Sequence, residues 1–213
     1  MYAPGPGRRF RGYGDLVVLI NPAIEAMRYM PLQSALEYYS TLKQDPPRAD
    51  FSADAIPVLL ILSSEGDWAT RKTFPAARFF STLNEAHRRI SPLGPEDGSN
   101  RSYSEWVMDV QAMGNYTGFN THHTINLSPG ATDKDVLSCP ALKDGELARK
   151  ILASAGSEQT FPNSGVMIQR NLEPSTTAAP YWHASLSTAI VKDHNSIVSL
   201  SLICWINQLV TSK

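Results

Sequence analysis

Two short runs of aliphatic residues place the strongest limit on how this chain can fold. Residues 15–20 read Asp-Leu-Val-Val-Leu-Ile, and residues 56–62 read Ile-Pro-Val-Leu-Leu-Ile-Leu. Runs of this length without polar alternation are typical of strands that are covered on both faces. Because such strands occur in parallel sheets flanked by helices, the two runs predict an α/β fold.

Segments with helical spacing alternate with these strands. Residues 23–42 and 74–90 carry apolar side chains at helical intervals, with Pro31 as a kink or a restart in the first segment. Residues 181–191 alternate as a strand does, and residues 195–210 have the broad apolar face of an amphipathic helix. This order of strands and helices predicts a short, mostly parallel sheet built through right-handed crossovers.

The region between these segments has a weaker pattern. Residues 91–180 are rich in Gly, Pro, Asn, Ser and Thr, and only residues 144–155 predict a helix there. We therefore expect a long irregular insertion, placed like a lid, within a single domain that spans residues 15–213. Glycine and arginine dominate residues 1–14, which predicts a flexible N-terminal tail, with a docking arm as the alternative.

Composition excludes several classes of protein. The 213 residues are 42% hydrophobic and 18% charged, which fits one domain with a real core. A formal net charge of −1 provides no long-range field for nucleic acid or anionic lipid. No apolar run approaches the roughly 20 residues of a membrane span, and no secretory signal opens the sequence, so we expect a cytoplasmic protein without a membrane partner.

The two cysteines lie in different contexts, and no motif indicates a bound cofactor. Cys139 falls in a loop-like stretch, whereas Cys204 falls in the apolar pattern of the last helix. This placement predicts two reduced thiols, of which Cys204 is a core residue.

An acid and a histidine each follow a predicted strand. Asp67 comes after the run at residues 56–62 and a short tip in which Gly66 permits a tight turn. His194 lies between the last predicted strand and the last predicted helix. Carboxyl ends of neighbouring parallel strands meet at one edge of a sheet, so these side chains can pair there. A carboxylate beside an imidazole fixes its tautomer and stabilises the imidazolium, which predicts the acid and base of a hydrolytic site.

Simpler interpretations stand beside this one. Asp67 could be a loop or capping carboxylate, and His194 could only cap or pack at the start of the final helix. Glu65 is a rival acid two positions away, whereas Asp193 is expected to cap the final helix.

Two other groups have an open interpretation. The adjacent pair His122 and His123 could bind zinc or iron, but adjacent histidines point in different directions and no acid or cysteine lies nearby at a chelating spacing, which favours packing or a lid contact. Several aromatic residues could line an acyl pocket beside the predicted acid, or they could belong to the core. These residues are Trp68, Phe74, Phe79 and Phe80.

Three blocks of the sequence resemble a known family. Residues 16–23 (Leu-Val-Val-Leu-Ile-Asn-Pro-Ala), 57–70 (Pro-Val-Leu-Leu-Ile-Leu-Ser-Ser-Glu-Gly-Asp-Trp-Ala-Thr) and 193–197 (Asp-His-Asn-Ser-Ile) are similar to the late strands of bacterial α/β-hydrolases of the serine esterase or lipase type. In that family the chain order is nucleophile, acid, histidine. The resemblance implies that Asp67 is the acid, that His194 is the histidine, and that the substrate is a small ester or thioester.

The sequence also departs from that family. No Gly-x-Ser-x-Gly turn occurs in the 213 residues, and the loop that supplies the oxyanion hole has no counterpart. The resemblance therefore implies a partial α/β-hydrolase, the carboxyl-terminal part of a truncated enzyme that is inactive alone. We also expect self-association through an exposed edge strand at residues 15–20. The alternatives are a non-catalytic binding module on the same scaffold and a metal-dependent hydrolase.

Overall fold

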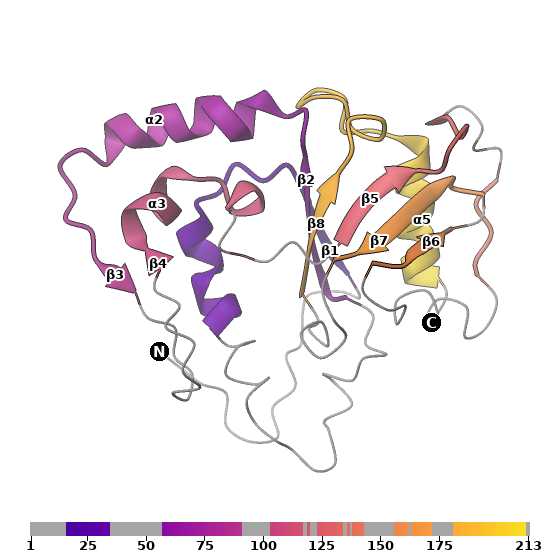
Figure 1. Cartoon of the computed structure of the whole chain (residues 1–213), viewed down its shortest axis with the longest axis horizontal. Coiled ribbons are helices and arrows are strands. Elements are labelled where there is room, and N and C mark those ends of the chain that lie inside the picture. Colours follow the sequence, from indigo (N-terminus) through magenta and orange to yellow (C-terminus); the bar gives the residue numbers. More distant parts are fainter. Residues whose placement is uncertain are drawn as a thin grey trace, which may run out of the picture.

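A six-stranded mixed sheet forms the centre of the computed structural model (Figure 1). The structure describes residues 16–34, 57–90, 103–116, 119, 123–133, 136, 138–142, 156–161, 163–171 and 181–211. The strands of this sheet, in spatial order, are β1 (Val17–Ile20), β2 (Leu59–Ser64), β8 (Tyr181–Leu186), β5 (His123–Leu127), β7 (Val166–Arg170) and β6 (Glu158–Thr160). A separate antiparallel pair consists of β3 (Arg89–Ile90) and β4 (Tyr103–Ser104).

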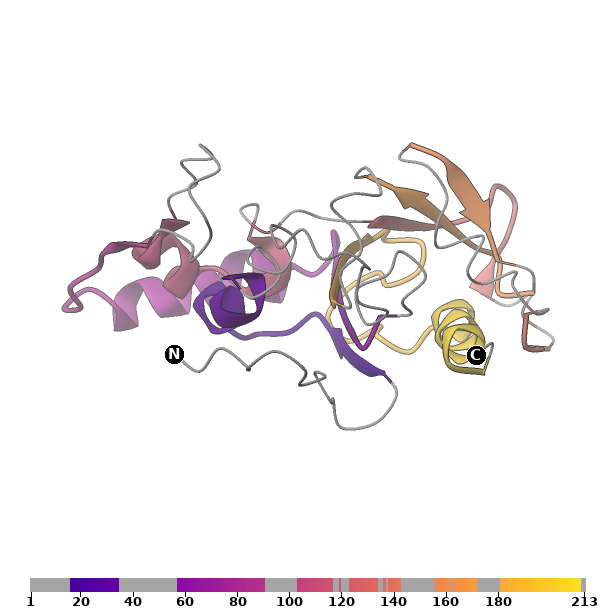
Figure 2. The same cartoon turned by 90° about the horizontal axis from the view of Figure 1, so that it is seen from below.

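Helical segments flank the sheet on both sides. They are η1 (Ala26–Tyr29), the π-helical turn η3 (Ala69–Thr73), α2 (Phe74–Ser81), α3 (Glu105–Val110), η4 (Met113–Asn115) and α5 (Leu200–Thr211). Figure 2 shows η1, α2 and α3 grouped together, apart from α5. None of the helices in the described ranges has the length and apolar content to cross a bilayer.

The sheet is mostly parallel, which confirms the α/β class predicted from the sequence. β1, β2, β8 and β5 run parallel to one another, whereas β7 pairs with β5, and β6 with β7, in antiparallel fashion. β2 pairs with β1 and β8 along its two edges, and its side chains pack into one core cluster through Leu60 and Leu62 and into another through Ile61, so both of its faces are covered, as its unbroken apolar sequence predicts.

The prediction of irregular structure across residues 91–180 is wrong where the structure describes this region. The region supplies α3 and three strands of the main sheet, β5, β7 and β6. These strands are short, and β5 carries the polar residues Thr124 and Asn126 at alternate positions, because only one of its faces is well buried. The predicted helix at 144–155 and the predicted tail at 1–14 lie outside the described residues.

Two predicted helices have different bounds. α2 ends at Ser81. Directly after it, the backbone N–H and the side-chain hydroxyl of Thr82 both donate to the carbonyl oxygen of Arg78. The last helix begins at Leu200 rather than Asn195. Its N-terminus is fixed by Asp133, whose Oδ1 accepts hydrogen bonds from Ser199 Oγ at 2.6 Å and from the Ser201 N–H at 2.8 Å.

The carboxylate of Asp133 acts as a cap from outside the helix. Burial alone would raise its pKa, but the hydrogen bonds from the Ser199 hydroxyl and from the first N–H groups of α5 outweigh burial and lower it. The favourable field at a helix N-terminus acts in the same direction. This capping joins the loop after β5 to α5 and was not visible in the sequence, because the partners are far apart along the chain.

The core has two layers, one on each face of the sheet. On one face, Leu60, Leu62 and Ala184 pack with Trp205 and Leu202 of α5. On the other face lies a second cluster, made by Ile61 with residues of η1, α3 and η4, namely Ala26, Tyr29, Met108 and Met113, and with Phe119. Successive side chains of β2 point to opposite faces, so this one strand contributes to both layers.

The expectation of two reduced thiols is wrong. Cys139 and Cys204 form a disulfide that ties the segment at residues 138–142 to α5. Cys204 is a buried core residue, as predicted, and the Gln208 side chain donates to the Pro140 carbonyl oxygen beside it. The bond has no signal in the sequence, because the two cysteines are 65 positions apart and only the fold brings the loop and the helix together.

Replacing Cys139 by Ser is expected to lower the free energy of unfolding by about 2–4 kcal/mol. The disulfide closes a loop across a sequence separation of 65, which restricts the unfolded chain. Urea unfolding of the oxidised protein and of the variant measures the difference. Wild-type protein kept in a reductant serves as the control and should match the variant; equal midpoints for oxidised wild type and variant would contradict the disulfide.

Candidate active site

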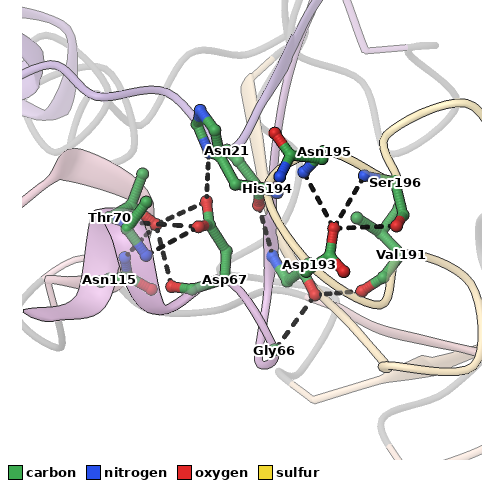
Figure 3. A network of polar contacts seen from close by, with 12 residues as sticks. Asn21, Gly66, Asp67, Thr70, Asn115, Val191, Asp193, His194, Asn195 and Ser196 are labelled. Atoms are coloured by element: carbon green, nitrogen blue, oxygen red, sulfur yellow. Dashed lines mark hydrogen bonds and ion pairs between the residues drawn. The ribbon is translucent and has the colours of Figure 1, made fainter.

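The pairing of β2 with β8 brings two distant segments to the same edge of the sheet. Leu62 lies opposite Ala184 and Ser64 lies opposite Leu186, so the two parallel strands end side by side. The loops that follow carry Asp67 and His194. His194 Nδ1 lies 3.1 Å from Asp67 Oδ2, although the residues are 127 positions apart (Figure 3). The structure thus brings together the two residues that the sequence singled out.

The Asp67 carboxylate is completely buried and is surrounded by donors from its own turn. Its Oδ1 accepts hydrogen bonds from the backbone N–H groups of Ala69 and Thr70, at 3.0 and 3.4 Å. Its Oδ2 accepts one from the Thr70 hydroxyl at 2.9 Å and faces His194. A buried carboxylate requires such donors, and here they also fix the direction of the oxygen that meets the imidazole.

A second layer of the fold supports this acid. Asn115, at the end of η4, donates from Nδ2 to Thr70 Oγ1 at 3.1 Å (Figure 3). η4 can approach β2 this closely because residue 114 is glycine: a Cβ there would lie 1.6 Å from Ser63 Oγ. No sequence pattern points to Asn115, because its role depends on this approach of η4 to β2.

The loop that carries His194 is held by the tip of β2. The Ser64 hydroxyl donates to the Val191 carbonyl oxygen and accepts a hydrogen bond from the Gly66 N–H at 3.1 Å. A Cβ at Gly66 would lie 2.0 Å from the Lys192 carbonyl oxygen, so only glycine allows the two loops to pack this closely. The backbone just before His194 is therefore placed by the turn that precedes Asp67.

Asn21 connects the end of β1 to the same turn. Its backbone has a φ of 47°, in the left-handed region that asparagine tolerates better than most residues. Its side-chain Oδ1 accepts from the Ser64 N–H at 2.7 Å, and its own N–H donates to the Leu62 carbonyl oxygen at 2.8 Å. Asn21 and Pro22 mark the end of the buried strand in the sequence, but the partner Ser64 lies 43 positions away and becomes apparent only in the fold.

One ring nitrogen of His194, Nδ1, contacts Asp67, and the other, Nε2, is directed away from it. An ionised Asp67 only accepts hydrogen bonds, so Nδ1 carries the proton in the neutral imidazole and Nε2 presents a lone pair. The side chain is 47% exposed, and within the described ranges no residue hydrogen-bonds to Nε2. This is the arrangement of a general base that receives a proton at Nε2.

The other two acids in these loops have different roles. Glu65 is exposed, and its Oε1 accepts a hydrogen bond from Ser185 Oγ at 3.4 Å. The prediction that Asp193 caps the final helix is wrong, because it caps a local turn. Asp193 Oδ1 accepts from the Ser196 hydroxyl and from the N–H groups of Asn195 and Ser196, and these hydrogen bonds lower its pKa.

The other open groups are only partly described. His123 is buried in β5, with its ring 4.3 Å from the Trp182 ring, and His122 lies outside the described residues. The core interpretation is wrong for the most prominent aromatics near the acid, which are exposed: Trp68, Phe79 and Phe80. α2 has no buried residue, and the elements that it contacts most among those described are η3 and α3 rather than strands of the sheet.

Replacing Asp67 by Ala is expected to change the tautomer of His194. In the wild type the neutral ring should carry its proton on Nδ1, because Asp67 Oδ2 accepts it; without the carboxylate, Nε2–H should become the major form. Long-range ¹H–¹⁵N NMR spectra of the histidine rings, recorded where His194 is neutral, distinguish the two forms. Glu65→Ala is the matched control and should leave the spectrum unchanged. A response to Glu65→Ala alone would identify Glu65 as the partner.

Comparison with known proteins identifies no family or relative that matches this chain. A scan against protein-family models found no match, and searches of curated proteins and of solved structures found none either.

Proposed function

We propose that this chain supplies the acid and the base of an ester or thioester hydrolase of the α/β-hydrolase type. Asp67 is the acid and His194 is the base. The observation that carries the proposal is the 3.1 Å contact between Asp67 Oδ2 and His194 Nδ1, which leaves Nε2 directed away from the acid. The order of acid and histidine along the chain, each after one of two neighbouring parallel strands, supports this type of hydrolase.

The chemistry of such a pair is a sequence of two proton transfers. His194 Nε2 removes the proton of a hydroxyl as its oxygen attacks the carbonyl carbon of the ester, and Asp67 stabilises the imidazolium that forms. The imidazolium then gives the proton to the leaving alcohol or thiol as the carbonyl re-forms. Thr70 and Asn115 keep the carboxylate oriented during both steps.

The nucleophile in this proposal is a serine outside the 213 residues. The sequence contains no Gly-x-Ser-x-Gly turn. Among the described residues no hydroxyl hydrogen-bonds to His194 Nε2, so we expect His194 to activate water in the isolated chain. The isolated chain should therefore form no acyl-enzyme and should hydrolyse only activated esters, slowly.

Assays with p-nitrophenyl acetate and a fluorophosphonate probe test this proposal. We expect no labelled serine, and a slow hydrolysis that falls to the uncatalysed rate in His194→Ala and at least tenfold in Asp67→Ala. Glu65→Ala is the matched control and should keep the wild-type rate. Equal rates in all variants would show that Asp67 and His194 do not catalyse the hydrolysis. A serine labelled in the wild type and not in His194→Ala would show that the nucleophile is in this chain.

The proposal extends to self-association through β1. This strand is at the end of the sheet and pairs only with β2 among the described strands, and Val17 on it is exposed. An edge strand offers unpaired backbone groups to a second strand. A defined oligomer without esterase activity would favour the alternative function, a non-catalytic interaction module on the same scaffold.

Replacing Val17 by Lys should reduce such association, because a charged side chain on an edge strand opposes pairing with another strand. Light scattering coupled to size exclusion should show a larger mass for the wild type than for this variant. Val210→Lys, which changes a partly exposed valine on α5, is the matched control and should keep the wild-type mass. Monomeric wild type would contradict the proposal.

The disulfide weighs against the cytosolic location expected from the sequence. Cytosolic thiols are kept reduced, whereas disulfides persist in oxidising compartments. The pairing of Cys139 with Cys204 therefore fits an oxidising compartment better.

A further inference from the structure

Three side chains with metal-binding atoms converge away from the acid–histidine pair. Glu85 and His87 lie in the segment after α2, and Asp109 lies on α3. Their ligand atoms all lie within 4.8 Å of one another. We call Glu85, His87 and Asp109 the α2–α3 cluster. Glu85 and His87 are neighbours in one segment, whereas Asp109 comes 22 positions after His87 (109 − 87), so the fold brings Asp109 to the other two donors.

The imidazole of His87 is the central member of this cluster. Its Nε2 is buried and makes no hydrogen bond among the described residues, and it lies 3.7 Å from Asp109 Oδ2. Only 15% of the His87 side chain and 18% of the Asp109 side chain are exposed. A separation of 3.7 Å is too long for a hydrogen bond. It is close to the spacing of about 3.3–3.6 Å between two donors that share one tetrahedral zinc ion.

The electrostatics around the cluster favour a cation. Glu85 and Asp109 supply two carboxylates, and Glu105 places a third negative charge near Asp109. Arg78 does not neutralise the Asp109 carboxylate directly. Its Nε donates to the Asp109 backbone carbonyl at 3.1 Å and lies 3.4 Å from Glu25 Oε1. A divalent cation between the ligands would offset the repulsion among these carboxylates.

The backbone of the cluster is already held in place. The Glu85 N–H donates to the Thr82 carbonyl oxygen at 3.0 Å, which fixes the turn after α2. The Arg88 N–H donates to Glu105 Oε2 at 2.6 Å, and the Glu105 N–H donates to the Arg88 carbonyl oxygen at 3.0 Å. These reciprocal bonds join the His87 segment to the start of α3. Glu85 is the exposed member of the cluster, so its side chain can rearrange most readily around an ion.

We propose that Glu85, His87 and Asp109 bind one divalent transition-metal ion, with zinc as the best match. One imidazole nitrogen and two carboxylates form a mixed N/O donor set that zinc accepts at about 2.0–2.2 Å, with water in the remaining position. The ion braces the segment after α2 against α3. This site is independent of the proposed hydrolase chemistry, because neither Asp67 nor His194 belongs to it.

Calorimetric titration of the metal-free 213-residue chain with zinc chloride tests the proposal. We expect one equivalent to bind with a Kd in the micromolar range or tighter, and Glu85→Gln to weaken binding at least tenfold. The Glu85 side chain is exposed, so this variant should keep the wild-type circular dichroism spectrum. Glu158→Gln, which neutralises an exposed acid on β6, is the matched control and should bind as the wild type does.

A second pair of variants distinguishes this site from chance binding at the other histidines. His194→Ala should retain the tight equivalent of zinc, whereas His87→Gln should lose it. Cobalt bound in place of zinc should give the visible absorption of a four-coordinate N/O site in the wild type and in His194→Ala. The proposal is overturned if no equivalent binds, if Glu85→Gln binds like the wild type, or if binding is lost with His194 instead.

Discussion

The parallel pairing of β2 with β8 is the interaction on which the rest of the structure depends. It sets the register in which Ser64 lies opposite Leu186, so the chain leaves both strands at one level of the sheet. The Ser64 hydroxyl then reaches the Val191 carbonyl oxygen, and Gly66 packs against Lys192. A slip of one residue would point Ser64 to the other face and separate the loops that carry Asp67 and His194. The polar site is thus a consequence of an apolar strand pairing.

The acid and the base are held by different means. Asp67 is fixed by side-chain and backbone donors of its own turn, and Asn115 reaches this turn from η4. Among the described residues, none supports the His194 ring in a comparable way, and its position follows from the backbone contacts at residues 191–192. The rigid member of the pair is therefore the buried carboxylate, and the half-exposed imidazole follows it. Because a buried carboxylate is costly without donors, its hydrogen bonds stabilise the fold as well as orient the base.

Features set by local pattern could be predicted from the sequence, whereas features set by distant partners could not. The unbroken apolar run before Asp67 indicated a doubly covered strand, and β2 is one. Asp67 and His194 were predicted as a pair because each follows a strand, and the structure places them in contact. The strands within residues 91–180 were missed because polar residues alternate along β5 and dilute its apolar signal. The disulfide and the capping of α5 by Asp133 were missed because their partners lie 65 to 68 positions apart.

The strands within residues 91–180 have a physical role that an irregular lid would not have. β8 pairs with β5 on the side opposite β2, so it lies inside the sheet and not at its edge. The His123 ring packs on Trp182, and Ile125 and Leu186 are buried together in the core. Without β5, β8 would have one free side, and its register with β2 would rest on a single ladder. The long interval between Asp67 and His194 therefore completes the sheet that holds them in contact.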